Sequence, residues 1–128
     1  NLVSNSGVVA ADVTGVGTAR RVLAATGYGS TGQAIFAYGY TGSYISASNL
    51  VSNTGVVATD VTGVGTAREG LGAARYGGDK AIFAYGHDGS SFNSMSNLVS
   101  NSGVIASDVS GVGTVRNYLA AVGYSLSA

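Results

Sequence analysis

The sequence predicts an all-β fold made of repeated units of four short antiparallel strands. The segment NLVSN recurs at Asn1, Asn49 and Asn97, which sets an internal period of 48 residues. Each period contains short runs of β-branched, aromatic and small apolar residues, which are typical of strands. The runs are separated by glycine-rich turns, and the 128 residues include 21 glycines and no proline. The chain therefore holds about 2.7 copies of one all-β unit.

Two of the strands are predicted from apolar runs. A short β-branched run follows an Asn-Ser-Gly or Asn-Thr-Gly turn and falls on residues 8–10, 56–58 and 104–106. The run Ala-Ile-Phe-Ala-Tyr, closed by a glycine, predicts a strand over 34–38 and its twin over 81–85. These twins start 47 residues apart and the next loop restores the period, so we expect the change in length to lie in turns, where it costs little.

The other two strands have weaker patterns. Residues 45–51 alternate apolar and small polar side chains, as a half-buried strand does. The segment 20–28 is ambiguous, because its leucine and alanines also suit a helix. Its second copy contains Gly70 and Gly72, which disfavour a helix and suit a strand crowded by its neighbours. We therefore predict a small-residue strand over 20–28 and another over 116–124.

A unit of this length with four strands is typical of one blade of a β-propeller. The alanine-rich strand suits the narrow centre of such a disc, where strands from all blades converge. We treat the chain as a single repeat domain with a partial blade, two complete blades and a second partial blade. Their predicted bounds are 1–19, 20–67, 68–115 and 116–128.

The repeated motifs resemble kelch repeats over essentially the whole chain. AIFAYG with the following Tyr-Thr-Gly or His-Asp-Gly resembles the first kelch strand and its glycine turn. VTGVGTAR with the Leu-Ala-rich segment after it resembles the arginine loop and inner strand. Tyr-Gly at 38–39 and 85–86 replaces the kelch double glycine, and the kelch tryptophan is absent. These departures resemble the kelch-like repeats of bacteriophage structural and tail-fibre proteins, which implies a virion or extracellular location.

The number of repeats raises a problem of closure. Closed propellers need about four to eight blades, so one chain would leave sheet edges and an apolar face uncovered. We therefore expect a homo-oligomer. A dimer, which would supply six near-complete blades, is favoured, and a trimer, which would come close to eight blades, is the second choice. The alternative is that the chain is a fragment of a longer polypeptide.

The composition excludes several classes of function. Only 9% of the residues are charged and the formal net charge is zero, so we expect no nucleic acid and no membrane as a partner. No apolar run is long enough to span a bilayer. The absence of cysteine and the single histidine exclude a thiolate metal site and the copper chemistry of kelch-like oxidases. We predict no catalytic residues, no cofactor and no metal, and therefore a protein that is not an enzyme.

Half of the charged side chains recur with the repeat. Each of these arginines follows an aspartate by eight residues across a Gly-Val-Gly turn. We interpret them as structural repeat pairs that pin loops, because guanidinium groups match carboxylates and backbone carbonyls well. A ring of identical binding sites is the alternative. The residues are Asp12, Asp60, Asp108, Arg20, Arg68 and Arg116.

The residues that do not repeat are the candidates for ligand binding. They cluster in the turn after AIFAYG and are Tyr40, Tyr44, His87, Asp88 and Phe92. A sugar-binding loop uses aromatic rings beside short polar side chains, which stack on one face of the sugar and hydrogen-bond to its edge. An ordinary polar turn is the alternative.

Three functions are compatible with these patterns. The first is a non-enzymatic structural or adhesive propeller that self-assembles from partial-propeller chains, as in a phage virion or tail-fibre component that binds glycan or protein through its loops. The second is a kelch-type intracellular scaffold for protein interactions. The third is a propeller fragment or engineered piece whose only function is self-assembly.

Overall fold

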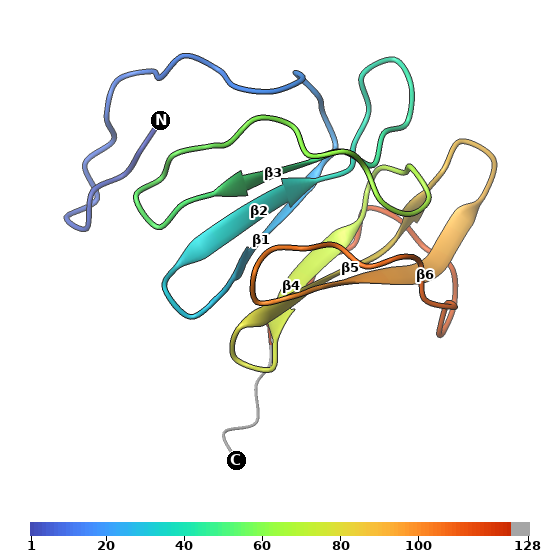
Figure 1. The fold of residues 1–128 in the computed structure, drawn as a ribbon. Coiled ribbons are helices and arrows are strands. Elements are labelled where there is room, and N and C mark those ends of the chain that lie inside the picture. Colours follow the sequence, from blue (N-terminus) through green and yellow to red (C-terminus); the bar gives the residue numbers. More distant parts are fainter. Residues whose placement is uncertain (124–128) are drawn as a thin grey trace.

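The computed structural model describes residues 1–123, and the prediction of an all-β fold is confirmed there. The described strands form two three-stranded antiparallel sheets, each with its strands in chain order (Figure 1). The described residues form no closed ring of sheets and contain no helix long and apolar enough to cross a membrane. The first sheet contains β1 (Ala24–Tyr28), β2 (Gln33–Ala37) and β3 (Ser48–Val51), and the second contains β4 (Gly72–Tyr76), β5 (Lys80–His87) and β6 (Phe92–Val99).

The two sheets are copies of one another in register as well as in sequence. Ile35 in β2 and Ile82 in β5 pair with equivalent residues of the neighbouring strands. The turn between the first two strands covers 29–32 in the first sheet and only 77–79 in the second. The one-residue change in spacing therefore lies in a turn, as predicted.

The central strands lie where the sequence predicts them, and the flanking strands are shorter. β2 and β5 match the predicted segments to within two residues at either end. β1 begins four residues later than predicted, because Val22 has a φ of 54° and the equivalent Gly70 has a φ of 65°. This left-handed backbone interrupts an extended chain. β3 begins three residues later than predicted, after a loop in which Ile45 N donates to Gly39 O (3.0 Å).

The predicted strands at 8–10, 56–58 and 104–106 are wrong as regular strands. Each makes one isolated bridge to the segment before it, such as the bridge from Val51 to Val57. The next bridge along the chain, from Ser48 to Val61, is shifted from this register by one residue. The Asn49 side chain lies at this slip, where its Nδ2 donates to Ala58 O (3.0 Å). The side-chain amide occupies an acceptor that a continuous ladder would use. The asparagines of the other two copies do the same.

The predicted strand 116–124 is also wrong over its described part, residues 116–123. Tyr124 lies outside the described residues. Within residues 1–123 this segment has no counterpart of β2 or β5 to pair with, and it packs against β4 instead. A Cβ at Gly72 would lie 3.2 Å from the side chains of Leu119 and Ala121, so glycine permits the close approach.

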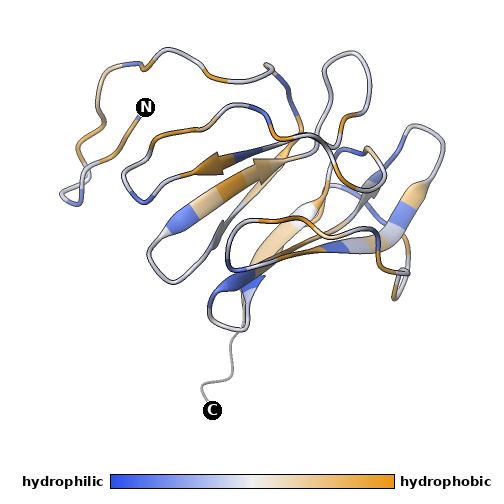
Figure 2. Cartoon of the chain, in the orientation of Figure 1, coloured by the Kyte–Doolittle hydropathy of each residue, from blue (hydrophilic) through white to orange (hydrophobic). Residues whose placement is uncertain are grey.

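The two sheets pack against one another, and the core lies between them. Ile35 and Ala37 of β2 are fully buried, as are Ala81 and Phe83 of β5. The Tyr38 ring meets the Phe83 ring edge-on, with centroids 5.5 Å apart. Hydrophobic residues run along strands of both sheets (Figure 2). The apolar runs of the repeat thus form one shared core.

The sheets do not meet through equivalent faces. Phe36 and Phe83 occupy the same repeat position, yet Phe36 is 36% exposed and Phe83 is 0% exposed. Because side chains alternate across a strand, the first sheet turns its Ile35 face to the core, whereas the second turns the opposite, Phe83 face. This packing is head to tail, so a different face of the repeat remains outside the core at each end.

Positions that are buried in the second sheet are exposed at the N-terminal end. Val3 is 63% exposed, whereas Val99, at the same repeat position, is fully buried. Residues 1–19 form an exposed arm beside the first sheet (Figure 1). A groove of about 460 Å³ lies between the arm and the sheet, and its lining includes Leu2, Val13, Val16, Phe36, Val51 and Val57.

Candidate functional site

Each sheet is held by a cluster of one threonine, one arginine, one asparagine and one aspartate, which we call the clasp. In the second sheet the Arg68 side chain is fully buried. Its Nη2 donates to Asn97 Oδ1 (2.6 Å), its Nη1 to Thr66 O (2.9 Å) and its Nε to Tyr85 O (2.8 Å). These bonds connect the entry to β4 with both β5 and β6, so one guanidinium ties three strands together.

The aspartate completes the clasp. Asp108 accepts hydrogen bonds from Thr66 N (3.0 Å), Thr66 Oγ1 (2.7 Å) and Asn97 Nδ2 (2.9 Å). Arg68 Nη1 lies 3.8 Å from the same carboxylate. The first sheet repeats this arrangement with Thr18, Arg20, Asn49 and Asp60, except that among the described residues the buried Arg20 Nε has no hydrogen-bond partner.

The arginine–aspartate pairing differs from the one predicted from spacing. Arg20 Nη1 lies 3.7 Å from Oδ1 of Asp60, which comes 40 residues later in the chain. Arg20 does not pair with Asp12, which comes eight residues earlier. Asp12 accepts instead from Asn1 Nδ2 (2.8 Å). The reason is topological. The loop after Asp60 leaves the first sheet and Arg68 enters the second, so residues eight apart belong to different sheets.

Hydrogen bonding stabilises the ionised form of both clasp aspartates. The hydrogen bonds from Thr18 and Asn49 lower the pKa of Asp60 below the usual 3.8. Burial acts in the opposite direction at Asp108, but the hydrogen bonds from Thr66 prevail together with those from the asparagine and the arginine charge, and its pKa is lowered too. Both carboxylates therefore stay negative opposite their arginines.

A tyrosine of the preceding sheet lies under the buried guanidinium. Arg68 Cζ is 4.5 Å from the centroid of the Tyr38 ring. Tyr38 OH donates to Val64 O (3.3 Å). Burial raises the pKa of Tyr38 to about 12, so its hydroxyl remains a neutral donor. Tyr38 follows β2 and Arg68 precedes β4, so this cation–π contact joins the two sheets.

Half of a clasp lies at each end of the described chain. Asn1 and Asp12 keep the hydrogen bond of the internal asparagine–aspartate pairs. Arg116 stacks on Tyr85 with its Cζ 4.2 Å from the ring centroid, and its Nη2 donates to Tyr85 OH (2.7 Å). Among the described residues, Arg116 pairs with no carboxylate and Asp12 with no arginine.

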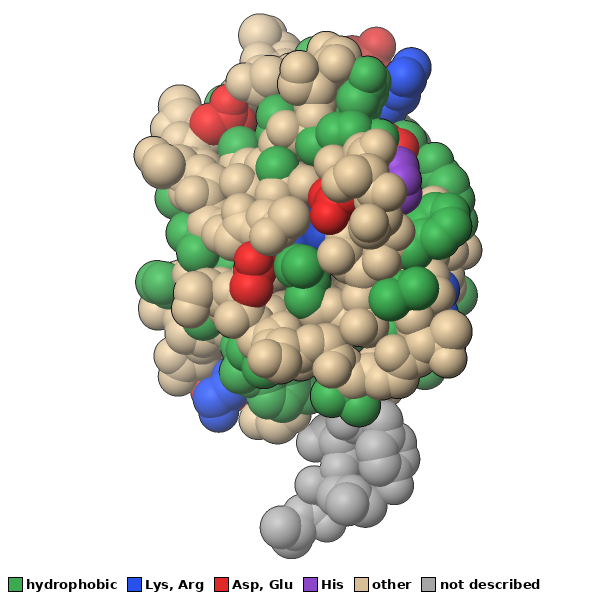
Figure 3. All heavy atoms as spheres, turned by 90° about the vertical axis from the view of Figure 1, so that its right-hand side faces the viewer, with side chains coloured by type: hydrophobic (Ala, Val, Ile, Leu, Met, Phe, Trp, Pro, Cys, Tyr) green, Lys and Arg blue, Asp and Glu red, His purple; other side chains and the backbone are tan. Residues whose placement is uncertain are grey.

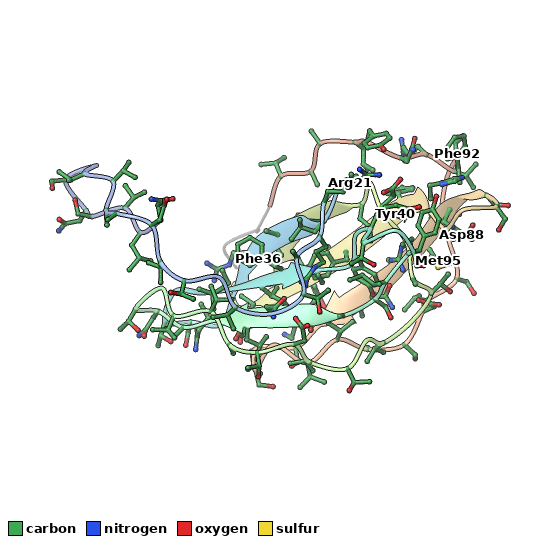
Figure 4. The ribbon with its side chains drawn as sticks, turned by 90° about the horizontal axis from the view of Figure 1, so that it is seen from above. Arg21, Phe36, Tyr40, Asp88, Phe92 and Met95 are labelled. Carbon is green, nitrogen blue, oxygen red and sulfur yellow. The ribbon has the colours of Figure 1, made fainter. Side chains whose placement is uncertain are left out.

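Four of the predicted ligand-binding residues come together in a row of rings, which we call the aromatic row. The centroids of Tyr40 and Tyr44 are 5.1 Å apart, those of Tyr44 and His87 are 5.8 Å apart, and those of His87 and Phe92 are 5.2 Å apart. Tyr44 OH and His87 Nδ1 are separated by 3.3 Å. Arg21, Tyr40 and Phe92 lie at the same end of the molecule (Figure 4). The row thus runs from the β2–β3 loop of the first sheet to the last residue of β5 and the first residue of β6 in the second.

The fifth candidate, Asp88, is engaged within its own turn. Its Oδ1 accepts from Ser90 N (2.9 Å) and Ser91 N (2.8 Å), and its Oδ2 accepts from Asn93 Nδ2 (3.0 Å). These hydrogen bonds, of which the one from Asn93 is the strongest influence, hold the pKa of Asp88 well below its usual range. Asp88 therefore shapes the turn that carries Phe92.

The sequence patterns did not single out the asparagines and threonines of the clasps. A signal was present, because Asn1, Asn49 and Asn97 share the 48-residue period of the arginines. A carboxamide within a run of strand residues needs partners when it is buried, and only the fold shows which arginine it meets.

The surface chemistry of the described part is simple. The histidine side chain lies at the surface beside hydrophobic side chains (Figure 3). In residues 1–123 there is no group of three or more His, Cys, Asp or Glu side chains that could hold a metal ion. No protein-family model matches this chain, and no curated protein matches it significantly. The function is therefore argued from the clasps and the aromatic row.

Proposed function

We propose that this protein is a non-enzymatic structural protein whose chains associate side by side into a β-propeller with kelch-like blades. Each sheet, together with the bridged segment after its third strand, would form one blade. The observation that carries the proposal is the head-to-tail packing of the two sheets, in which Phe36 is exposed where Phe83 is buried. A further copy would cover the same faces at the ends of the chain.

Exposed apolar side chains at both ends support association. Monomeric proteins rarely expose large contiguous apolar patches. The N-terminal arm exposes Leu2, Val3 and Val9, beside the apolar groove on the first sheet. Near the other end Val112 and Val122 are among the most exposed hydrophobic residues. Val3 and Val9 are the counterparts of Val99 and Ile105, which are buried in the second repeat.

Measurement of mass in solution tests this proposal directly. Size-exclusion chromatography with light scattering should show a homo-oligomer, with a dimer of six near-complete blades favoured over a trimer. Electron microscopy of the same fraction should show discs. A chain that stays monomeric over the accessible concentration range would contradict self-assembly. The kelch-like resemblance favours a virion or extracellular setting, such as a tail fibre, for this structure.

The aromatic row favours a second function, adhesion to a carbohydrate. Its rings are partly exposed and lie beside the Arg21 guanidinium, 5.1 Å from the Tyr40 ring, so stacking faces and a hydrogen-bond donor occur together. A glycan array should show binding that is lost when Tyr44 and Phe92 are both replaced by alanine. Tyr76→Ala, at the end of β4, is the matched control and should bind as the wild type does. Equal signals from all three proteins would rule out the row as the site.

A further inference from the structure

We propose that two copies of this chain join through a third clasp, in which Thr114 and Arg116 of one copy close on Asn1 and Asp12 of the other. This inference deepens the self-assembly proposed above and rests on it. It names the residues that form the junction and the atoms that they would pair.

The two internal clasps supply the template. In both, the asparagine lies 29 residues after the arginine, as Asn97 does after Arg68. The aspartate follows the asparagine by 11 residues in the internal clasps, and Asp12 follows Asn1 by the same 11. The N-terminal end thus carries the acceptor half of a clasp, and the Thr-Val-Arg segment ending at Arg116 carries the donor half.

The donor half shares its tyrosine contacts with the internal clasp, and its Arg116 Nη2, which donates to Tyr85 OH, would turn to the carboxamide of the partner copy. Arg116 stacks on Tyr85 at 4.2 Å, as Arg68 stacks on Tyr38 at 4.5 Å. Tyr85 OH donates to Val112 O at 3.3 Å, which repeats the bond that Tyr38 makes in the other sheet. The two arginines differ in burial, because Arg68 is fully buried and Arg116 is exposed. The guanidinium is therefore oriented but lacks the carboxamide and carboxylate that complete an internal clasp.

The acceptor half is also formed. Asn1 Nδ2 donates to Ala10 O (2.9 Å) and to Asp12 Oδ1 (2.8 Å), which are the two bonds of the internal asparagines. In the internal clasps the remaining atoms, the asparagine Oδ1 and the aspartate Oδ2, accept from the arginine and the threonine. Within the described residues these two atoms of Asn1 and Asp12 have no such donor. The donors of Thr114 and Arg116 thus correspond by repeat position to the acceptors that Asn1 and Asp12 leave open.

A second copy is the occupant that fits both ends at once. The opposite charges of Arg116 and Asp12 attract, and the N-terminal arm exposes Val3 and Val9, whose counterparts Val99 and Ile105 are buried. The composite unit would take its inner segment, 117–123, from one copy and its outer segments from the N-terminal arm of the next. Its described residues include no counterpart of β2 or β5, so the clasp is the main link among them. Because the junction is head to tail, it closes into a ring when the rotation per copy allows.

Reciprocal charge reversal tests the third clasp. Arg116→Asp and Asp12→Arg are made in separate chains, and sedimentation velocity measures association of each chain alone and of an equimolar mixture. Each variant alone should associate at least about tenfold more weakly than the wild type, because like charges then meet at the junction. The mixture should recover wild-type association, and native mass spectrometry should show equal numbers of the two chains.

Controls separate this inference from self-assembly itself. Lys80→Asp reverses a charge in the exposed pair with Asp79 and should associate normally. Circular dichroism verifies that each variant is folded, and Arg116→Gln replaces Arg116→Asp if that chain unfolds. The third clasp would be refuted if neither reversal weakens association, or if mixing the two weakened chains does not restore it. Either result would leave the proposal of self-assembly intact. A monomeric wild type would overturn both.

Discussion

Arg68 and Asn97 are 29 residues apart in the chain, and Arg68 Nη2 lies 2.6 Å from Asn97 Oδ1. Arg20 and Asn49 make the same bond at the same length. A fully buried guanidinium is costly unless several acceptors replace its water, and here a carboxamide and two backbone carbonyls do so within 3 Å. The clasp thus gathers polar side chains beside the apolar core, and in the second sheet it links the entry to β4 with β6, which the sheet hydrogen bonds do not link.

The asparagine of the second clasp should matter far more than its N-terminal counterpart. We expect Asn97→Ala to lower the free energy of unfolding by about 1–3 kcal/mol, because it leaves Nη2 of the buried Arg68 without its acceptor and Ala106 O without its donor. Asn1→Ala should change it by less than about 0.5 kcal/mol at concentrations where the chain is monomeric. Urea denaturation measures both. Equal effects would show that burial of the clasp is not what stabilises it.

The two equivalent phenylalanines should also differ in effect. Phe83→Ala should cost about 3–5 kcal/mol of folding free energy, because it empties a site between the two sheets. Phe36→Ala should cost the isolated chain much less, since that ring is partly exposed, but it should weaken association of the copies. Thermal unfolding and sedimentation velocity separate the two effects. A Phe36→Ala chain that associates like the wild type would show that this face is not at the junction.

The lowered pKa values of Asp60 and Asp108 predict loss of stability in acid. A carboxyl whose pKa is lower in the folded chain than in the unfolded chain stabilises the fold in its ionised form. That contribution is fully present well above the unfolded value of 3.8 and is lost as the pH falls through the folded value. We expect the free energy of unfolding to be level down to about pH 5 and to decline below about pH 4.

Substitutions of the aspartates test whether the clasps cause this loss of stability in acid. Asp108→Asn should be less stable at neutral pH and should show a flatter decline in acid, as should Asp60→Ala, which removes the acceptor for Thr18 and Asn49. Asp88→Asn measures the share of the exposed β5–β6 turn, because the pKa of Asp88 is also lowered and the loss of its carboxyl group should flatten the decline too. If only the Asp88 variant flattens the curve, the clasps do not carry the pH dependence.

Tyr44→Ala should leave the fold intact. Its ring contacts Tyr40 and His87 at the surface and none of the residues between the two sheets. We expect an unchanged thermal midpoint together with weaker glycan binding. A fall in soluble yield or in the midpoint would show that this tyrosine belongs to the core.

Two glycines with the same backbone conformation should respond differently to alanine. Gly39 has a φ of 112° and Gly42 has a φ of 113°. A Cβ at Gly39 would lie 2.7 Å from Arg21 O, whereas a Cβ at Gly42 would have no atom within 4 Å. Both variants bear the cost of an unfavourable φ, about 1–3 kcal/mol, and Gly39→Ala should cost more because the Arg21 backbone must move. Similar midpoints for the two variants would contradict the crowding at Gly39.

The all-β fold, the central strands and the variable turns could be predicted, because each depends on local pattern. Ala-Ile-Phe-Ala-Tyr is apolar and β-branched enough to be a strand in either copy, whichever face it buries. Which face it buries could not be predicted, since Phe36 and Phe83 have the same local sequence and differ only in whether a sheet lies on that side. Residues 56–58 have a strand-like composition, but the side-chain bond from Asn49 interrupts their ladder.

The candidate site could also be predicted only in part from the sequence. The aromatic row was predicted as a group because its members are the non-repeating residues of equivalent turns, although only the fold shows Tyr44 beside His87. The clasp partners were not predicted. Arg20 lies eight residues from Asp12 and forty from Asp60, and nearness in sequence favours the wrong partner whenever the intervening loop passes from one sheet to the next.

The fixed offsets within the clasps have a consequence for how the gene can change. Duplication or loss of one entire 48-residue unit would alter the number of sheets but not the donor half at Thr114 and Arg116 or the acceptor half at Asn1 and Asp12. Polypeptides of different lengths would then remain mutually compatible, and the size of the assembly could vary in whole increments during evolution without redesign of a single contact.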